Sequence, residues 1–220
     1  MAQASFARAL LLSDKPPPVG TDPTIEWQQI GPLRSRAEYS RFMVRELADY
    51  ISTSHALCVQ WDGFVLNSAA WDPRFLEFDY VGAVWPQFPD GFNVGNGGFS
   101  LRSRRLMEAC RELPFEGNVA EDVLICRVHR IDLEHAGMRF APQAVAGKFS
   151  FERTKRTGEE FGFHGGFNLI RLMPPDAALA LVKSLEPQVL SRSERRELLW
   201  WALSKGQLKI ALLFLARLLV

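Results

Sequence analysis

The fold is decided by residues 58–67, which run CVQWDGFVLN. This largely apolar stretch lies between a helical pattern and a Gly/Asn turn, so it predicts a buried strand. Asp62 is the one residue in the stretch whose side chain is ordinarily charged at neutral pH, and Gly63 follows it directly. A carboxylate in such a place is costly unless it is paired, hydrogen-bonded or bound to a metal. Asp62 is therefore the first candidate for a functional residue.

Composition narrows the classes of function. The chain has 220 residues, 47% hydrophobic, which is enough for one large core with an appendage. A formal net charge of +1 argues against a nucleic-acid partner, because no basic excess is available to neutralise phosphates. The three cysteines lack CxxC spacing, which indicates a reduced, intracellular setting. The only apolar patch near the start, residues 9–12, is too short for a signal peptide, so we expect a cytoplasmic protein.

The order of the patterns predicts an α/β domain. Two short strands are expected at residues 6–13 and 25–30, and an amphipathic helix at 35–51 precedes the strand at 58–67. This order predicts a layered domain with a mixed, mainly parallel sheet, in which ligands lie beyond the carboxyl ends of the strands. Further strands are expected at residues 80–84, 138–141 and 144–151.

Glycines mark a second candidate segment, residues 93–98, NVGNGG. Glycine at such density indicates positive φ or a close approach of the backbone to a ligand. The spacing differs from dinucleotide-binding and phosphate-binding loops, so neither is predicted. Ser103, shortly after this segment, is expected to cap a helix that runs to about residue 113.

Two later motifs contain further candidates, each with an ordinary alternative. Glu121 and Asp122 open a predicted helix that Gly137 ends, and adjacent carboxylates at a helix start also complement its dipole. His164 stands among aromatic residues in FGFHG, where a histidine is more often packed in a core than bound to a metal. Both interpretations remain open for each motif. The predicted apolar stripe of the helix is formed by Leu124, Val128 and Ile131.

The composition changes after residue 173, which divides the chain into predicted domains at 1–173 and 174–220. Three helices are expected in the second part, at about 175–186, 192–204 and 206–219. Trp200, Trp201 and the run 210–216 are too apolar for a free surface, so they should pack on the core, on a protein partner or at a membrane face. In the last case the protein would be peripheral to the inner membrane.

Six sequence blocks between residues 9 and 171 resemble a bacterial family of glycosyltransferase-like proteins of unknown function. The blocks are, in order, VQWDGFVLN, FDYVGAVW, VGNGGFSLRS, EDVLICR, RFAPQAVAGKFSFE and FGFHG. That family is similar to transferases of the GT-A fold, which use nucleotide-sugar donors and commonly a divalent metal. The resemblance implies a GT-A-like domain, a nucleotide-sugar donor and a carbohydrate or glycolipid acceptor, as in polysaccharide biosynthesis.

The resemblance also implies where donor and metal would bind. Asp62 matches the acidic motif for metal and diphosphate, although this sequence has one aspartate there instead of Asp-x-Asp. Asn96, Gly97 and Gly98 would line the sugar site together with Gln60, and His164 would complete the shell of a Mn²⁺ or Mg²⁺ ion. A hard cation of this kind neutralises the charge on a leaving diphosphate.

The acidic pair would lie near the acceptor. Glycosyl transfer needs a base within hydrogen-bond reach of the acceptor hydroxyl. Asp122 is the predicted catalytic base, because its short side chain suits accurate positioning, and Glu121 is the supporting carboxylate. A single carboxylate base favours an inverting mechanism.

The sequence departs from the GT-A pattern at its start. Such domains open with a strand, a turn and a helix that help to hold the nucleotide, and this chain begins within or just after that helix, so the first strand is expected to be missing. The sequence therefore leaves two possibilities open. The protein is either an active, metal-assisted glycosyltransferase or a non-catalytic domain of transferase descent that binds a carbohydrate or a partner. A metal-dependent hydrolase would need clustered ligands that the sequence lacks.

Overall fold

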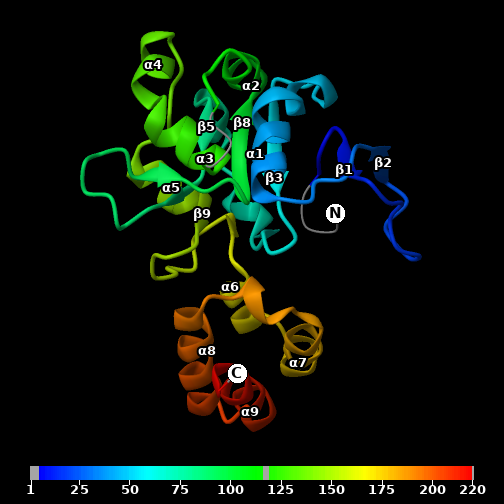
Figure 1. Ribbon diagram of the computed structural model, residues 1–220. Coiled ribbons are helices and arrows are strands. Elements are labelled where there is room, and N and C mark those ends of the chain that lie inside the picture. Colours follow the sequence, from blue (N-terminus) through cyan, green and yellow to red (C-terminus); the bar gives the residue numbers. More distant parts are fainter. Residues whose placement is uncertain (1–4, 116–118, 220) are drawn as a thin grey trace.

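The computed structural model describes residues 5–115 and 119–219 of the chain. An α/β unit with small sheets occupies one end of the molecule, and a group of helices, α6–α9, occupies the other (Figure 1). The strands are β1 (Ala9–Ser13), β2 (Ile25–Gln29), β3 (His55–Val59), β4 (Phe64–Val65), β5 (Tyr80–Val81), β6 (Ala83–Val84), β7 (Val94–Gly95), β8 (Phe99–Ser103), β9 (Ser150–Phe151) and β10 (Gly162–Phe163). The helices are α1 (Arg36–Arg45), α2 (Arg104–Cys110), α3 (Glu121–Val123), α4 (Arg130–His135), α5 (Gln143–Phe149), α6 (Gly166–Leu172), α7 (Pro175–Ser184), α8 (Arg192–Ser204) and α9 (Leu208–Leu219).

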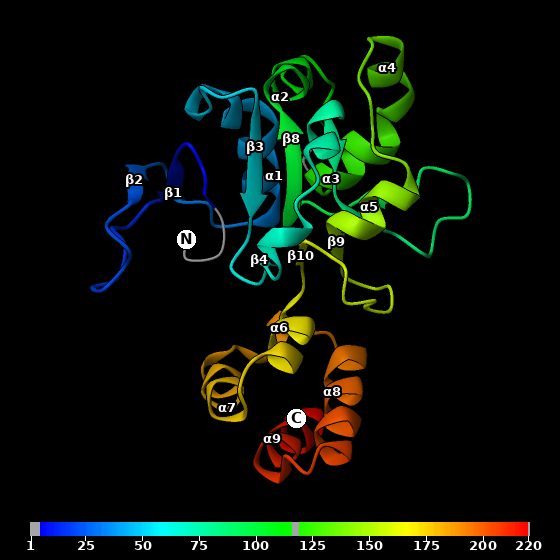
Figure 2. The same cartoon turned by 180° about the vertical axis from the view of Figure 1, so that it is seen from behind.

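The sheets are mixed, but the prediction of a mainly parallel sheet is wrong. The central sheet has the order β3-β8-β5, and both of its pairs are antiparallel. A parallel neighbour needs a crossover of a dozen or more residues, usually a helix, whereas residues 60–98 between β3 and β8 form only short strands and 3₁₀ turns. Parallel pairing joins β1 to β2 and β9 to β10, while β4 and β7 pair antiparallel with β10 and β6. No described strand pairs with the outer edge of β3 (Figure 2).

The stretch 58–67 is two short strands, so the predicted single buried strand is wrong. β3 ends at Val59, and the chain turns through residues 60–63, where Gly63 N donates to Gln60 O at 3.0 Å. It then continues as β4. Val59 and Phe64 are both about half exposed, so the apolar run is not a core strand throughout. Asp62 therefore lies in the turn between the strands.

Helix starts were easier to predict than strands. Ser35 Oγ accepts the backbone N–H of Glu38 at the start of α1, and Ser103 Oγ accepts that of Leu106 at the start of α2, which confirms the predicted cap at Ser103. The predicted helix over 35–51 is interrupted at Glu46, after which a 3₁₀ turn follows (Leu47–Tyr50).

Two predicted strands are wrong. Residues 144–151 form most of α5 and then β9, because the short apolar run is also compatible with a helix, which here begins after Pro142. Residues 138–141 make only an isolated parallel bridge, between Phe140 and Tyr80.

The helix that starts at Glu121 is broken by a π-helical turn (Leu124–Val128) between α3 and α4. Gly137, at φ +85°, ends α4 as predicted. Of the predicted apolar stripe, Leu124 is buried, but Val128 and Ile131 are about half exposed. The wider π turn changes the phase of the following side chains, so a 3.6-residue period carried across it points to the wrong face.

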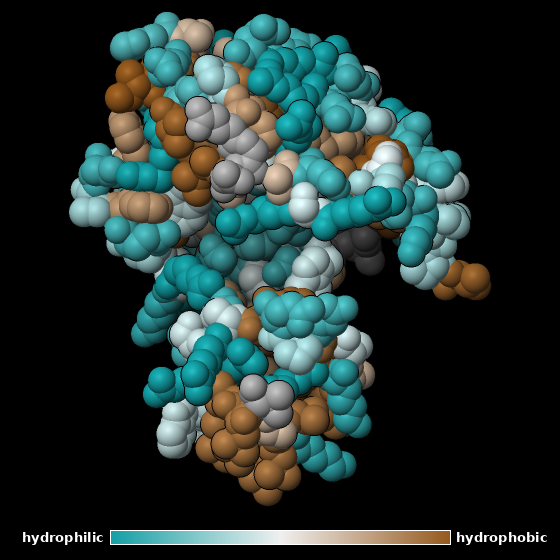
Figure 3. Space-filling model, viewed as in Figure 1, coloured by the Kyte–Doolittle hydropathy of each residue, from teal (hydrophilic) through white to brown (hydrophobic). Residues whose placement is uncertain are grey.

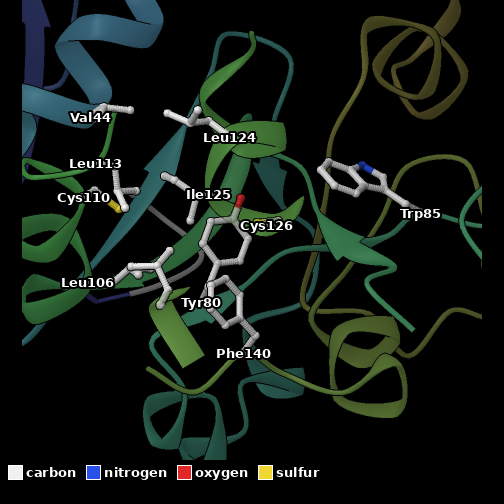
Figure 4. Close-up of a cluster of buried hydrophobic side chains, with 11 residues drawn as sticks. Val44, Tyr80, Trp85, Leu106, Cys110, Leu113, Leu124, Ile125, Cys126 and Phe140 are labelled. Atoms are coloured by element: carbon white, nitrogen blue, oxygen red, sulfur yellow. The ribbon is translucent and has the colours of Figure 1, made fainter. Parts of the chain in front are cut away.

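The central strand β8 separates two apolar cores. Its side chains alternate, so Phe99 and Leu101 pack with Phe75 and Phe149 on one face. The second core joins β5, α1, α2 and the π turn, and its Tyr80 and Phe140 rings are stacked with centroids 5.9 Å apart (Figure 4). The sheet is thus covered on both faces, with α5 on one and α1–α3 on the other.

The C-terminal helices form a core of their own. Helices α6–α9 share a cluster of buried side chains that includes Phe167, Val182 and Phe214. Because α6 belongs to this cluster, the packed helical unit begins before the predicted boundary at 173/174. Trp201 packs against the cluster, whereas Trp200 is 68% exposed, so of the predicted contacts Trp200 does not make the one with the core.

Asp79 ties three segments of the α/β unit together. Its buried carboxylate accepts hydrogen bonds from Ser103 Oγ, Arg105 Nε and the backbone N–H of Arg139, at 2.5, 2.6 and 2.7 Å. Burial by itself would raise the pKa of Asp79, but these hydrogen bonds outweigh it and lower the pKa below its ordinary value.

The Asp79→Asn variant should lower the free energy of unfolding by about 1–3 kcal/mol near neutral pH. Because the folded-state pKa is depressed, the contribution of Asp79 is complete above the unfolded pKa of about 3.9 and is lost as pH falls through the folded value. Urea unfolding of both proteins from neutral to acidic pH should show the difference shrinking below about pH 4. A difference that stays constant at acidic pH would contradict this role for Asp79.

Candidate functional site

Two turns and the end of β10 meet at the candidate site. The turn after β3 is joined to the turn before β8, where Gln60 N donates to Gly98 O at 2.8 Å. The same turn is joined to the end of β10, where Gly165 N donates to Asp62 O at 3.1 Å. The structure thus brings together segments that lie about a hundred residues apart in sequence.

Four polar side chains form what we call the histidine cluster: Asp62, Asn96, Glu152 and His164. His164 Nε2 lies 3.2 Å from Asp62 Oδ1, and its Nδ1 lies 3.5 Å from Glu152 Oε1. Asn96 Nδ2 donates to Glu152 Oε2 at 2.8 Å and lies 3.1 Å from His164 Nδ1. The imidazole therefore stands between two carboxylates, one at each ring nitrogen.

The two carboxylates control the protonation of His164. Burial by itself would lower the pKa of His164, but the nearby carboxylates of Asp62 and Glu152 outweigh it and raise the pKa to about 9. The two carboxylates thus favour the protonated form of the ring.

The Asp62–His164 contact is close but poorly aligned. Asp62 Oδ1 and His164 Nε2 are both buried, and neither makes a hydrogen bond of normal geometry to any described residue. Protein ligands lie only about 2.0–2.6 Å from a bound cation, so two side-chain atoms this close together could bind one ion. The observed 3.2 Å is therefore compatible with a shared ion.

The described residues contain no group of three or more His, Cys, Asp and Glu side chains that could hold a metal. The reason is local, because Glu152 approaches the ring nitrogen opposite to Asp62. A cation at Asp62 and His164 would take its remaining ligands from water or a bound anion, as Mg²⁺ commonly does. Glu152 would then orient the ring through Nδ1, an arrangement common among metal-binding histidines.

Glycine is required in the turn before β8 because side chains fill the space around it. A Cβ on Gly98 would lie 2.0 Å from His164 Nε2, and one on Gly97 would lie 1.9 Å from Glu121 Oε1. Asn96 has φ +78°, a conformation that Asn tolerates better than most residues. Its Oδ1 accepts the N–H of Gly98 at 3.0 Å and so closes the turn.

A second polar group is formed by Ser100, Arg102, Glu121 and Asp122. Glu121 has a structural role in this group. Only 4% of Glu121 is exposed, and its Oε1 accepts a hydrogen bond from Arg102 Nη2 at 2.9 Å. Arg102 is 1% exposed and also donates to Ser100 Oγ at 3.0 Å. Burial raises the pKa of Glu121, the charge of Arg102 offsets part of this, and the neighbouring Asp122 adds to it. A carboxylate enclosed in this way cannot reach an acceptor.

Asp122 is the more accessible member of the acidic pair. Its Oδ2 accepts the N–H of Gly97 at 3.0 Å, and its Oδ1 accepts the N–H of Val123 at 2.8 Å. Asp122 is half-buried, whereas Glu121 is buried. The turn at residues 96–98 therefore connects both polar groups, through Asn96 to His164 and through Gly97 to Asp122.

The structure unites most of the predicted residues and adds two. Asp62, Asn96 and His164 meet as expected, while the Gln60 side chain is directed to helix α1, where its Nε2 donates to Tyr39 Oη at 2.9 Å. Glu152 and Arg102 are not among the predicted residues. Glu152 could have been found as the charged end of the apolar run KFSFE, and Arg102 as a charge inside the apolar strand FSLRS.

Residues 24–164 match a family described as "Protein of unknown function (DUF5672)". The match covers more than half of the chain. The chain belongs to this family. The DUF5672 match contains every residue of the histidine cluster and the acidic pair, and it ends at His164, just before the C-terminal helices. No curated protein matches the chain.

Breaking the Arg102–Glu121 pair should be costly. Arg102→Leu leaves Glu121 buried without its partner and should lower the free energy of unfolding by about 3–5 kcal/mol. The double variant Arg102→Leu/Glu121→Leu removes both charges and should be less destabilised than Arg102→Leu alone. Chemical denaturation of the three proteins measures this coupling. Strictly additive losses would show that the two charges do not depend on each other.

Proposed function

We propose that this protein is a metal-assisted glycosyltransferase, which moves a sugar from a nucleoside-diphosphate donor to a hydroxyl acceptor. The observation that carries the proposal is the pair Asp62 and His164, two buried and misaligned ligand atoms 3.2 Å apart. The resemblance of the six sequence blocks to GT-A-like transferases supports the same reaction.

The ligand set suits a Mn²⁺ or Mg²⁺ ion that is shared with the donor. Asp62 and His164 would hold the ion, and two protein ligands leave several positions for diphosphate oxygens and water. When bound, such an ion neutralises the charge that develops on the leaving diphosphate. Asn96 and Glu152 hold the imidazole in place, so the ligands are oriented before the donor arrives.

Asp122 is the proposed base. Its two carboxylate oxygens accept the backbone N–H groups of Gly97 and Val123, which hold the side chain in one orientation, as a positioned base requires. The side chain is linked through Gly97 to the turn that also carries Asn96, so base and donor site share one rigid support. The buried Arg102–Glu121 pair fixes the start of α3 and thereby positions Asp122.

A thermal-shift screen of nucleoside diphosphates, with and without Mn²⁺, tests donor binding. We expect at least one nucleotide to raise the melting temperature, and to do so more strongly with Mn²⁺, because a ligand that binds only the folded state stabilises it. In Asp62→Asn and His164→Gln, the part of the rise in melting temperature that depends on Mn²⁺ should be lost. Asp176→Asn, an exposed carboxylate in α7, is the matched control and should respond like the wild type.

Two results of the screen would contradict the proposal. One is a complete set of nucleotides that leaves the melting temperature unchanged at saturating concentration. The other is a Mn²⁺-dependent shift of equal size in wild type and Asp62→Asn, since the ion would then bind elsewhere.

The base is tested with Asp122→Asn, which keeps the shape of the side chain and removes its basicity. The donor in this assay is a nucleotide sugar with the nucleobase identified in the screen. The rate of sugar transfer should fall by roughly 10²–10⁴-fold. The nucleotide-induced thermal shift should remain, because Asp122 is not a donor ligand in this proposal. Normal transfer by Asp122→Asn would show that Asp122 serves only as a cap of α3. Donor binding without transfer by the wild type would favour the non-catalytic carbohydrate-binding alternative.

A further inference from the structure

An apolar stripe lies on the outside of the α8–α9 hairpin. Four exposed leucines recur along α9 at intervals of three and four residues, which places them on one face of the helix. Two more exposed apolar side chains lie in the last turns of α8. We call these six residues the apolar stripe: Trp200, Leu203, Leu208, Leu212, Leu215 and Leu219.

The stripe is distinct from the core of the helical unit. The opposite face of α9 is buried in that core through Ile210, Ala211 and Phe214. The exposed leucines are therefore not needed to hold α9 in place. Leu212 is 64% exposed and Leu219 is 81% exposed. Contiguous exposed apolar surface of this kind marks an interaction site. A brown patch gathers over the C-terminal helices, at the end of the molecule away from the α/β unit (Figure 3).

Basic side chains accompany the stripe. Lys205 lies at the end of α8 and Lys209 in the first turn of α9; both are exposed, as is Arg196 on α8. Residues 191–220 contain six basic and two acidic side chains, whereas the rest of the chain contains 20 basic and 23 acidic ones. Positive charge is thus concentrated in the segment that carries the apolar stripe.

We propose that the apolar stripe docks this protein on the surface of a bilayer that contains anionic lipids. Leucines and a tryptophan would enter the boundary between headgroups and acyl chains, and Lys205 and Lys209 would contact the anionic headgroups. A second copy of the chain fits less well, because a two-fold contact through this face would bring equal positive charges together. None of the described helices is long and apolar enough to cross a membrane, so the contact is with the surface.

Docking through α8–α9 would not involve residues of the candidate site. The stripe lies on the outer helices of the C-terminal unit, while the histidine cluster lies in the α/β unit (Figure 1). The two units are joined by α6, whose Leu169 packs against Phe151 and Phe163, and by the ion pair of Arg153 with Glu194 at 2.6 Å. If the proposed transferase function holds, this arrangement suits an acceptor carried by a lipid.

Co-sedimentation of the full chain with vesicles tests the docking without any assay of transfer. The wild type should bind vesicles that contain phosphatidylglycerol and bind pure phosphatidylcholine vesicles much less, and binding should weaken as salt is added. Leu212→Gln/Leu215→Gln should lower the partition coefficient about tenfold or more. Lys205→Glu/Lys209→Glu should weaken binding to the anionic vesicles by at least about fivefold per charge.

The matched control is Leu76→Gln/Ile131→Gln, which removes two exposed apolar side chains from the α/β unit and should bind like the wild type. Circular dichroism checks that each variant is folded. Three results would overturn the proposal: a wild type that does not bind anionic vesicles, equal binding by the wild type, the leucine variant and the lysine variant, or a wild-type dimer that Leu212→Gln/Leu215→Gln converts to monomer. The last result would assign the stripe to self-association. Because transfer is not measured, the docking can fail or succeed independently of the glycosyltransferase proposal.

Discussion

A buried ion pair between Arg102 and Glu121 is the constraint on which the candidate site depends. Arg102 lies in the central strand β8, on the face opposite to Phe99 and Leu101, and Glu121 opens α3. Neither charge reaches water, so each requires the other. The pair fixes the helix start next to the strand, and Gly97 is a glycine because the Glu121 carboxylate fills the space that its Cβ would need.

The turn before β8 connects the buried ion pair to the residues of the candidate site. Through Gly97 it holds Asp122, and through Asn96 it holds Glu152 and His164. The candidate base and the candidate ligands are therefore not independent features. They are two ends of one hydrogen-bonded turn, which explains how a site built from short strands and loops can be well positioned. A site with its ligands already oriented needs less reorganisation when a donor binds.

Short sequence motifs predicted where helices begin and end. They did not predict how strands far apart in the sequence pair with one another. Ser103 and Gly137 mark helix ends by their own chemistry, so both were predicted correctly. The direction of strand pairing depends on the path of the whole chain between two strands, and here the path between β3 and β8 contains no crossover helix. The convergence of Asp62 and His164 followed from the family resemblance, while Glu152 was missed because an acidic residue after an apolar run is common. The π turn was missed because a regular helical period cannot reveal an extra residue, and Val128 was misplaced as a result.

We propose that Asp62 and His164 share a divalent cation with the diphosphate of a donor. Pulsed electron paramagnetic resonance of Mn²⁺ bound to the protein with a stabilising nucleoside diphosphate tests it most directly, because nuclei coupled to the ion identify its ligands. We expect coupling to an imidazole nitrogen and to phosphorus in the same sample, and loss of the nitrogen coupling in His164→Gln. Bound Mn²⁺ without any nitrogen coupling, or with the same nitrogen coupling in His164→Gln, would contradict it.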